Sequence, residues 1–149
     1  MIDLPRYDDP ELRIGRWLNA GAGLIVLGWC ALQAQQSSNF TGGKVTAMDE
    51  KPTGNIAHFR FDPGARTKWH SHSGGQIILA EEGVTRTQVK GGPVIELHAG
   101  ETIYAPPGVM HWHGAAPDQG GVQYNVSRGM TTWGEEVTEK EFTAAPQKR

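Results

Sequence analysis

Residues 64–83 read GARTKWHSHSGGQIILAEEG, and this stretch carries the clearest structural signal in the chain. It places His70 and His72 next to glycine-rich turns, ahead of the apolar run QIILA at 76–80. Residues i and i+2 of a strand point to the same face about 6–7 Å apart, so both imidazoles can reach one metal ion. The pattern predicts short strands that carry a metal-binding pair, although a single such pair is weak evidence.

A second pair of this kind, His111 and His113, lies within residues 100–113 (GETIYAPPGVMHWH), again beside a turn. Two pairs so close together in the chain predict a metal site. The other two histidines are expected away from it. His98 falls in a surface turn, and His58 is out of phase with the apolar residues of its strand and is expected on the outer face.

Short alternating runs separated by Gly and Pro turns make up the chain beyond residue 54. The 149 residues include 20 glycines and 9 prolines, which is too many turns for a helical bundle. Strands are expected at 55–61, 76–80, 84–90, 94–97, 102–105, 122–127 and 131–137. Such strands predict an all-β sandwich or small barrel. Residues 138–142 are expected to form one helical turn or a solvated end.

Composition excludes several classes of protein. Lys and Arg total 14 against 16 Asp and Glu, so the net charge of −2 offers no basic face for nucleic acid. Hydrophobic residues make up 38% and charged residues 20%, which is too apolar for a disordered chain. The length corresponds to one domain. The single cysteine excludes an internal disulfide and a cysteine-based zinc site.

The N-terminal segment has the pattern of a secretory signal. Arg13 and Arg16 precede an apolar stretch at 17–32, and polar residues follow. We expect cleavage after Ala34, which leaves a single domain at 35–149, periplasmic or secreted and without stable membrane association. An uncleaved membrane anchor and a buried core helix are the alternatives, but a membrane span needs about 20 apolar residues.

The two histidine segments together resemble the two sequence motifs of the cupin superfamily, over roughly residues 55–127. The matching residues are Gly64-x5-His70-x-His72-x3-Gln76-x6-Gly83 and Gly100-x5-Pro106-x-Gly108-x2-His111. This resemblance implies a double-stranded β-helix, a jelly-roll-like barrel. It also implies one divalent metal per chain, held by His70, His72, Gln76 and His111.

Gln76 departs from the resemblance, because cupins more often have Glu there. Glu81 and Glu82 lie five and six residues further along an expected strand, about 16–20 Å away, and are too distant to replace it. The fourth ligand is therefore the Gln76 amide oxygen or a water molecule. If the ligand is water, Gln76 is expected to form a hydrogen bond near the metal instead. Neutral ligands leave the full +2 charge of the ion, which favours binding an anion or polarising a substrate oxygen.

Residues 40–42, 63–72, 111–117 and 136–138 resemble small single-domain bacterial cupins that include the manganese-dependent hydroxynitrile lyases. The resemblance implies a lyase that binds a cyanohydrin at the metal, removes a proton and releases cyanide. Manganese is the metal so implied, and Fe, Ni, Co and Zn stay open. An Fe-dependent dioxygenase and a non-catalytic periplasmic binder of a small anion are the alternative functions.

The residues around the metal ligands are expected to contact a small-molecule substrate. Those lyases have a histidine where this chain has Gln123, so His113 is the remaining acid–base candidate. Gln123 is expected to contact the substrate. Alternatively, His113 only orients His111. Gln123, Asn125 and Ser127 alternate along one strand, so they line a polar cavity or face water. The other candidates for the pocket wall are Ala57, Phe59, Phe61, Ile78 and Tyr104.

Two tryptophans alternate out of phase with the expected ligands. Trp69 and Trp112 are therefore expected in a second layer or in a subunit interface. A small barrel with exposed edge strands gains by pairing, so a homo-oligomer, dimer or tetramer, is expected.

Overall fold

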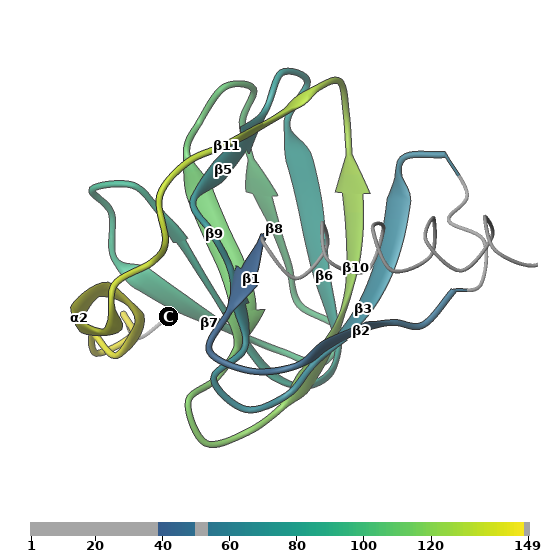
Figure 1. The fold of residues 1–149 in the computed structure, drawn as a ribbon. Coiled ribbons are helices and arrows are strands. Elements are labelled where there is room, and N and C mark those ends of the chain that lie inside the picture. The colour runs from purple at the N-terminus through teal and green to yellow at the C-terminus, as the bar shows by residue number, and fades with distance from the viewer. Residues whose placement is uncertain (1–38, 50–53, 148–149) are drawn as a thin grey trace, which may run out of the picture.

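The computed structural model describes residues 39–49 and 54–147, and it confirms the all-β fold expected from the sequence. Antiparallel strands wrap into a nearly closed barrel, with one short helix on its outer side (Figure 1). The elements are β1 (Phe40–Thr41), β2 (Val45–Ala47), β3 (Ile56–Phe61), β4 (Arg66–Thr67), β5 (His70–His72), β6 (Gln76–Val89), β7 (Val94–His98), β8 (Thr102–Ala105), β9 (His111–Ala115), β10 (Gly121–Ser127), β11 (Thr131–Trp133) and α2 (Glu139–Phe142).

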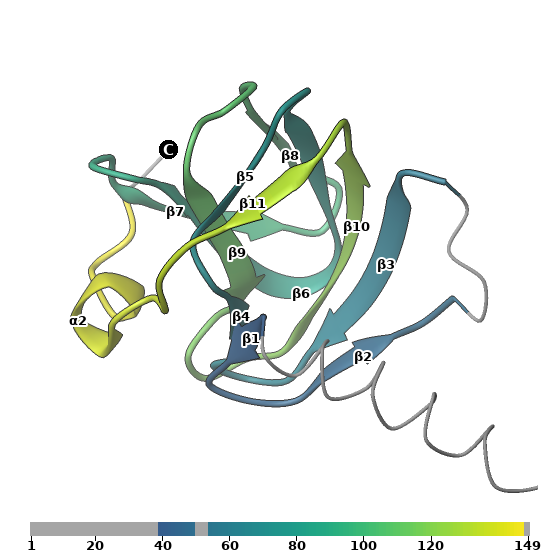
Figure 2. The same cartoon turned by 45° about the horizontal axis from the view of Figure 1, so that its top comes forward.

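Strand β6 belongs to both walls of the barrel. Its first half pairs with β10 and β8, and its second half pairs with β9 and β7 (Figure 2). The sequence had predicted two strands, 76–80 and 84–90, separated by a turn, and this prediction was wrong. Gly83 has a φ of 69°, and a Cβ there would stand 2.1 Å from the Gly120 carbonyl oxygen. Glycine therefore lets the strand bend without ending.

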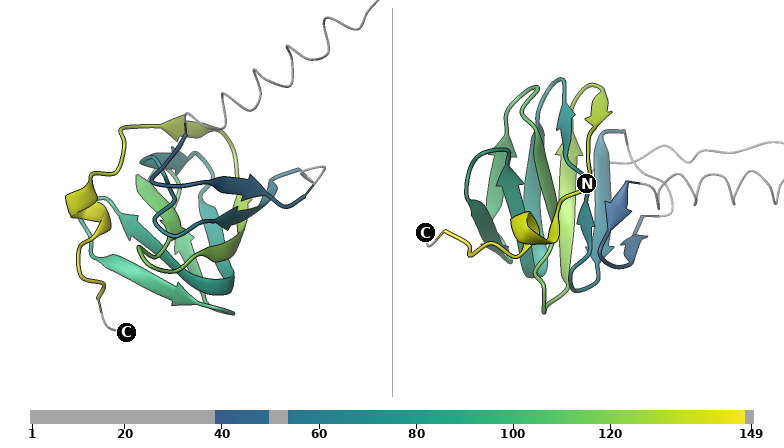
Figure 3. Two further views of the ribbon diagram at one scale, coloured as in Figure 1. Left: turned by 60° about the horizontal axis from the view of Figure 1, so that its bottom comes forward. Right: turned by 60° about the vertical axis from the view of Figure 1, so that its left-hand side comes forward.

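The remaining strands complete the two walls. One wall has the order β2-β3-β10-β6-β8, and the other has the order β1-β4-β9-β6-β7, with β5 joining β9 to β11. The two walls face each other across the barrel (Figure 3), and His70 of β5 pairs with His111 of β9 in the sheet register. The final strand is shorter than the predicted 131–137, because β11 ends at Trp133.

Outside the barrel, α2 covers an apolar cluster. The helical turn expected at 138–142 is present, with Thr138 as the N-cap in a capping box with Glu141. Its Phe142 packs with Trp69 and Trp112, which confirms the expected second layer for the tryptophans. The other buried clusters lie around Phe61 and Ile78.

The predicted signal segment at 1–34 lies outside the described residues. Within residues 39–49 and 54–147, no helix has the length and apolar character needed to cross a membrane.

Candidate metal centre

Three histidines from two neighbouring strands meet inside the barrel. His70 and His72 stand on β5, and His111 opens β9, directly paired with His70 in the sheet register. Their ligand nitrogens all lie within 4.8 Å of one another, and each residue is at most 4% exposed. The structure therefore brings together three of the four residues that the resemblance implies as ligands, in a cluster compatible with a metal ion.

Each of the three imidazoles has a hydrogen-bond partner at Nδ1, on the side of the ring away from the cluster, so Nε2 is the nitrogen that faces the cluster. His70 Nδ1 donates to the Lys68 carbonyl at 2.9 Å, and His111 Nδ1 donates to the Val109 carbonyl at 2.9 Å. His72 Nδ1 lies 3.0 Å from Thr131 Oγ1. His72 Nε2 is buried with no hydrogen-bond partner among the described residues. The carbonyl partners fix the tautomer of His70 and His111 that leaves an Nε2 lone pair for a metal, and the Thr131 hydroxyl is compatible with the same tautomer at His72.

Gln76 supplies the fourth inward atom. Its Nε2 donates to Ser127 Oγ at 2.9 Å, which turns Oε1 toward His111 Nε2 at 2.7 Å. The one N–H of a neutral His111 already points to Val109, so two acceptor atoms face each other with no proton between them. A shared cation resolves this contact, and the residues present fit a divalent ion held by three imidazoles and an amide oxygen.

Burial keeps the cluster uncharged at neutral pH. Desolvation, followed by the charge of His111, lowers the pKa of His70 from 6.5 to about 3, and the same two causes lower that of His72 to about 4. The pKa of His111 is also lowered, chiefly by burial. Neutral imidazoles are the form that binds a metal, so the site does not need to lose protons first at neutral pH.

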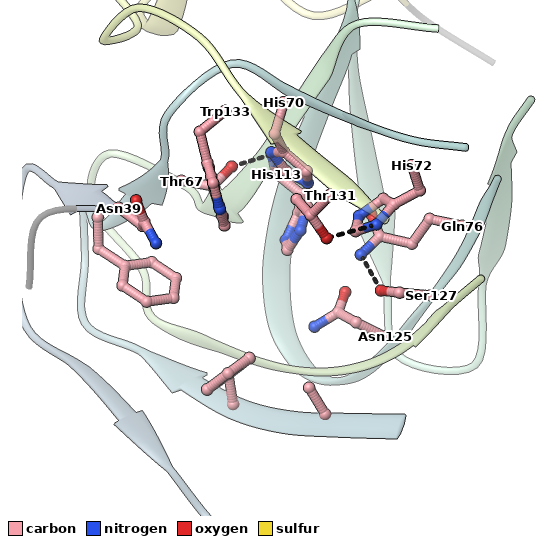
Figure 4. A pocket seen from close by; sticks show the side chains of 13 residues that line it. Asn39, Thr67, His70, His72, Gln76, His113, Asn125, Ser127, Thr131 and Trp133 are labelled. Carbon is pink, nitrogen blue, oxygen red and sulfur yellow. Dashed lines mark hydrogen bonds between the residues drawn. The ribbon is translucent and has the colours of Figure 1, made fainter. Parts of the chain in front are cut away.

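A cavity of about 250 Å³ opens beside the cluster, and Figure 4 shows the side chains that line it. One part of its wall is apolar, formed by Phe40, Ala57, Phe59 and Trp133. The other part is polar and consists of Asn39, Thr67, His70, His72, Gln76, His113, Asn125, Ser127 and Thr131. The volume lies below the roughly 300–1,000 Å³ of most ligand pockets, so it suits a small molecule with an apolar end and a polar end.

Known proteins are similar to this chain in sequence. The sequence profile of the cupin domain matches residues 57–127. An (R)-mandelonitrile lyase from Granulicella tundricola is 38% identical over 90 residues, which cover 58% of this chain and 69% of the relative. The chain belongs to the cupin family.

Solved structures agree with this assignment. A cupin-like protein from Thermotoga maritima is 41% identical and superposes with a TM-score of 0.59, covering 71% of this cupin and 86% of that chain. The polyketide cyclase RemF from Streptomyces resistomycificus has a TM-score of 0.52 at 20% identity, covering 70% and 77% of the two chains. The second likeness concerns the fold alone.

His113 and Gln123 form a buried pair behind the pocket of this cupin. Gln123 Nε2 donates to the Gly114 carbonyl at 3.2 Å, so its Oε1 accepts from His113 Nδ1 at 2.8 Å. His113 lines the cavity, whereas Gln123 is fully buried outside its lining. The expected substrate contact through Gln123 is therefore corrected: its amide holds His113 in one tautomer, with Nε2 left as the acceptor.

Three other pocket predictions need correction. Tyr104 is 54% exposed, because it alternates with the inward Ile103 on β8 and so faces outward. Phe61 and Ile78 are fully buried in apolar clusters and do not line the cavity themselves, although the Phe61 cluster includes the lining residues Phe40 and Phe59. The predicted Ala57, Phe59, Asn125 and Ser127 do line the cavity.

Sequence reasoning missed five lining residues. Phe40 and Thr67 lie within the segments that carry the lyase resemblance, which was the one signal available for them. Asn39, Thr131 and Trp133 come from segments whose approach to the cavity depends on the β11–β5 pairing and on the position of β1. The two remaining histidines lie outside the site as expected: His98 is exposed, and His58 stacks on Tyr124.

Proposed function

We propose that this cupin is a metal-dependent lyase that cleaves small cyanohydrins to an aldehyde and hydrogen cyanide, with manganese as its metal. The observation that carries the proposal is the contact of Gln76 Oε1 with His111 Nε2, within the cluster of His70, His72 and His111, at the wall of a small, partly apolar cavity. The 38% identity to an (R)-mandelonitrile lyase supports this reaction class.

The metal ligands of this site carry no charge. His70, His72, His111 and Gln76 would hold a divalent ion without reducing its +2 charge, and the ion would supply Lewis acidity. Such chemistry needs no change of oxidation state, so it fits a lyase. Aromatic side chains of Phe40, Phe59 and Trp133 offer the opposite wall to the apolar part of a substrate.

His113 is the group that moves the proton. Burial lowers its pKa well below 6.5, so the ring is neutral at pH 7 and its Nε2 accepts the hydroxyl proton of the cyanohydrin. The electron pair of that O–H bond forms the carbonyl, and the pair of the bond to the nitrile carbon leaves with cyanide. His113 then returns the proton to cyanide, which gives hydrogen cyanide. Gln123 keeps Nδ1–H paired throughout and so preserves the reactive tautomer.

The test is cyanide release under anaerobic conditions. Protein reconstituted with Mn²⁺ is incubated with racemic mandelonitrile, and benzaldehyde and cyanide are measured above the spontaneous rate. The proposal predicts equal amounts of both products, loss of the rate in His113→Ala, and an unchanged rate in the control His98→Ala, whose side chain is exposed. No cyanide from aromatic or aliphatic cyanohydrins with Mn²⁺, Fe²⁺ or Co²⁺ would exclude the lyase. Substrate-dependent oxygen consumption in a parallel aerobic assay would favour the dioxygenase.

A further inference from the structure

The amide of Asn125 is buried in the pocket wall without a partner. The residue is 2% exposed on β10, and neither Nδ2 nor Oδ1 has a hydrogen-bond partner within the described part of the chain. Buried amides are almost always paired, because leaving one unpaired costs free energy. An amide that keeps both atoms free beside a cavity is therefore available to a ligand.

The neighbours of Asn125 on β10 are already engaged. Ser127 accepts from Gln76 on the side of the metal ligands, and Gln123 accepts from His113 on the side of the proton acceptor. Side chains two residues apart on a strand are separated by about 6–7 Å, so Asn125 stands between these two groups. Figure 4 shows it reaching in from β10 beside Ser127.

The neighbouring strand β3 places a small residue beside this amide. Asn125 pairs with Ala57 of β3, and both residues line the cavity. The side chain of Ala57 is only a methyl group, so it obstructs a ligand at the amide less than a larger side chain would. Asn125 lines the same cavity as His70, His72 and His113.

We propose that Asn125 anchors the second polar group of the substrate and selects a neutral group there over a carboxylate. The inference rests on the proposed function: the hydroxyl oxygen lies at the metal ligands, and the Asn125 Nδ2–H donates to the nitrile nitrogen on the neighbouring carbon. A carboxamide complements both amide atoms, since it brings an acceptor and a donor. A carboxylate brings only acceptors, and one of them would face Oδ1.

The test compares ligands that share one carbon framework. Mandelamide and mandelate are titrated calorimetrically into Mn²⁺-loaded wild type, Asn125→Leu and the control Asn55→Leu. Asn55 is exposed in the turn just before β3. We expect Asn125→Leu to bind mandelamide about tenfold or more weakly than the wild type, which corresponds to the loss of one or two hydrogen bonds. The affinity for mandelate should change little. Asn55→Leu should bind both ligands as the wild type does.

Thermal unfolding of the metal-free variants separates a ligand contact from a structural role. Leu has nearly the shape of Asn and removes an unpaired amide, so Asn125→Leu should melt at or above the wild-type temperature. A clear fall in melting temperature, or mandelamide bound as tightly by Asn125→Leu as by the wild type, would overturn the proposal. Asn125→Ala provides a second variant for the same titrations.

The two proposals fail differently. Weakened mandelamide binding in Asn125→Leu, without cyanide release from the wild type, would retain the anchor and reject the lyase. Cyanide release by the wild type at an unchanged KM in Asn125→Leu would retain the lyase and reject the anchor.

Discussion

Replacing Gln76 by Glu adds one negative charge to a set of neutral ligands while keeping the shape of the side chain. The Gln76 Oε1 atom lies 2.7 Å from His111 Nε2, so the new carboxylate would sit within the cluster itself. Unit charges about 4 Å apart interact by roughly 4 kcal/mol at an effective dielectric constant of about 20, and a divalent ion doubles this to about 8 kcal/mol. Desolvation of the carboxylate costs several kcal/mol and offsets most of this attraction.

The net gain is then about 1–3 kcal/mol, so the metal ion should bind roughly 5-fold to 150-fold more tightly. Cyanide release should nevertheless fall, because the net charge of the site drops from +2 to +1 and stabilises a bound oxygen anion less. Mn²⁺ affinity is measured by competition with a chelator. The control Gln119→Glu adds the same charge in an exposed loop and should bind metal as the wild type does. Equal Mn²⁺ affinity in folded Gln76→Glu and wild type would refute the assignment of Gln76 as a ligand.

The remaining predictions concern proton binding, tautomer and backbone. Without metal, the lowered pKa values of His70 (about 3) and His72 (about 4) make the unfolded chain bind more protons below pH 6.5. Urea unfolding should show stability that is level above pH 6.5 and falls by about 1.4 kcal/mol per pH unit for each histidine as the pH drops to 4; a flat profile would contradict this. Gln123→Leu should lower kcat for cyanide release about tenfold or more with little change in KM. This loss is smaller than the roughly 10²–10⁴-fold loss expected from removing the base itself. An unchanged kcat and pH profile would exclude the role of Gln123 in holding His113. Gly83→Ala should destabilise the fold by more than about 2 kcal/mol in urea, because its φ is 69° and a Cβ meets Gly120; wild-type stability would show that the bend tolerates a side chain.

The metal cluster was the part of the site most accessible to sequence reasoning. Two His-x-His pairs, combined with the two-residue periodicity of a strand, predict that imidazoles share a face, and the motif spacing adds Gln76. Pairing of β5 with β9 then brings His70 beside His111, which a single strand cannot show. The all-β class was also predictable, because the density of Gly and Pro turns is a local property of the sequence.

Other features depend on pairing between distant strands. Gln123, Asn125 and Ser127 do share an inward face, yet only the packing of β9 against β10 shows that Gln123 contacts His113 instead of the cavity. The register of β10 on β6 shifts between Val122 and Gln123, where Glu81 of β6 has no partner in the register, and local periodicity does not reveal this shift. Tyr104 was misplaced because a four-residue strand gives too few alternations to settle which face is inward.

Metal content is the most direct test of the central claim that His70, His72, Gln76 and His111 hold one divalent ion. Elemental analysis is made on wild type, His72→Ala and the exposed control His98→Ala, each purified without chelator. The account predicts about one equivalent of Mn or another divalent metal in wild type and His98→Ala, and its loss in folded His72→Ala. No metal in the wild type, and no uptake on titration with Mn²⁺, Fe²⁺, Co²⁺, Ni²⁺ or Zn²⁺, would contradict it.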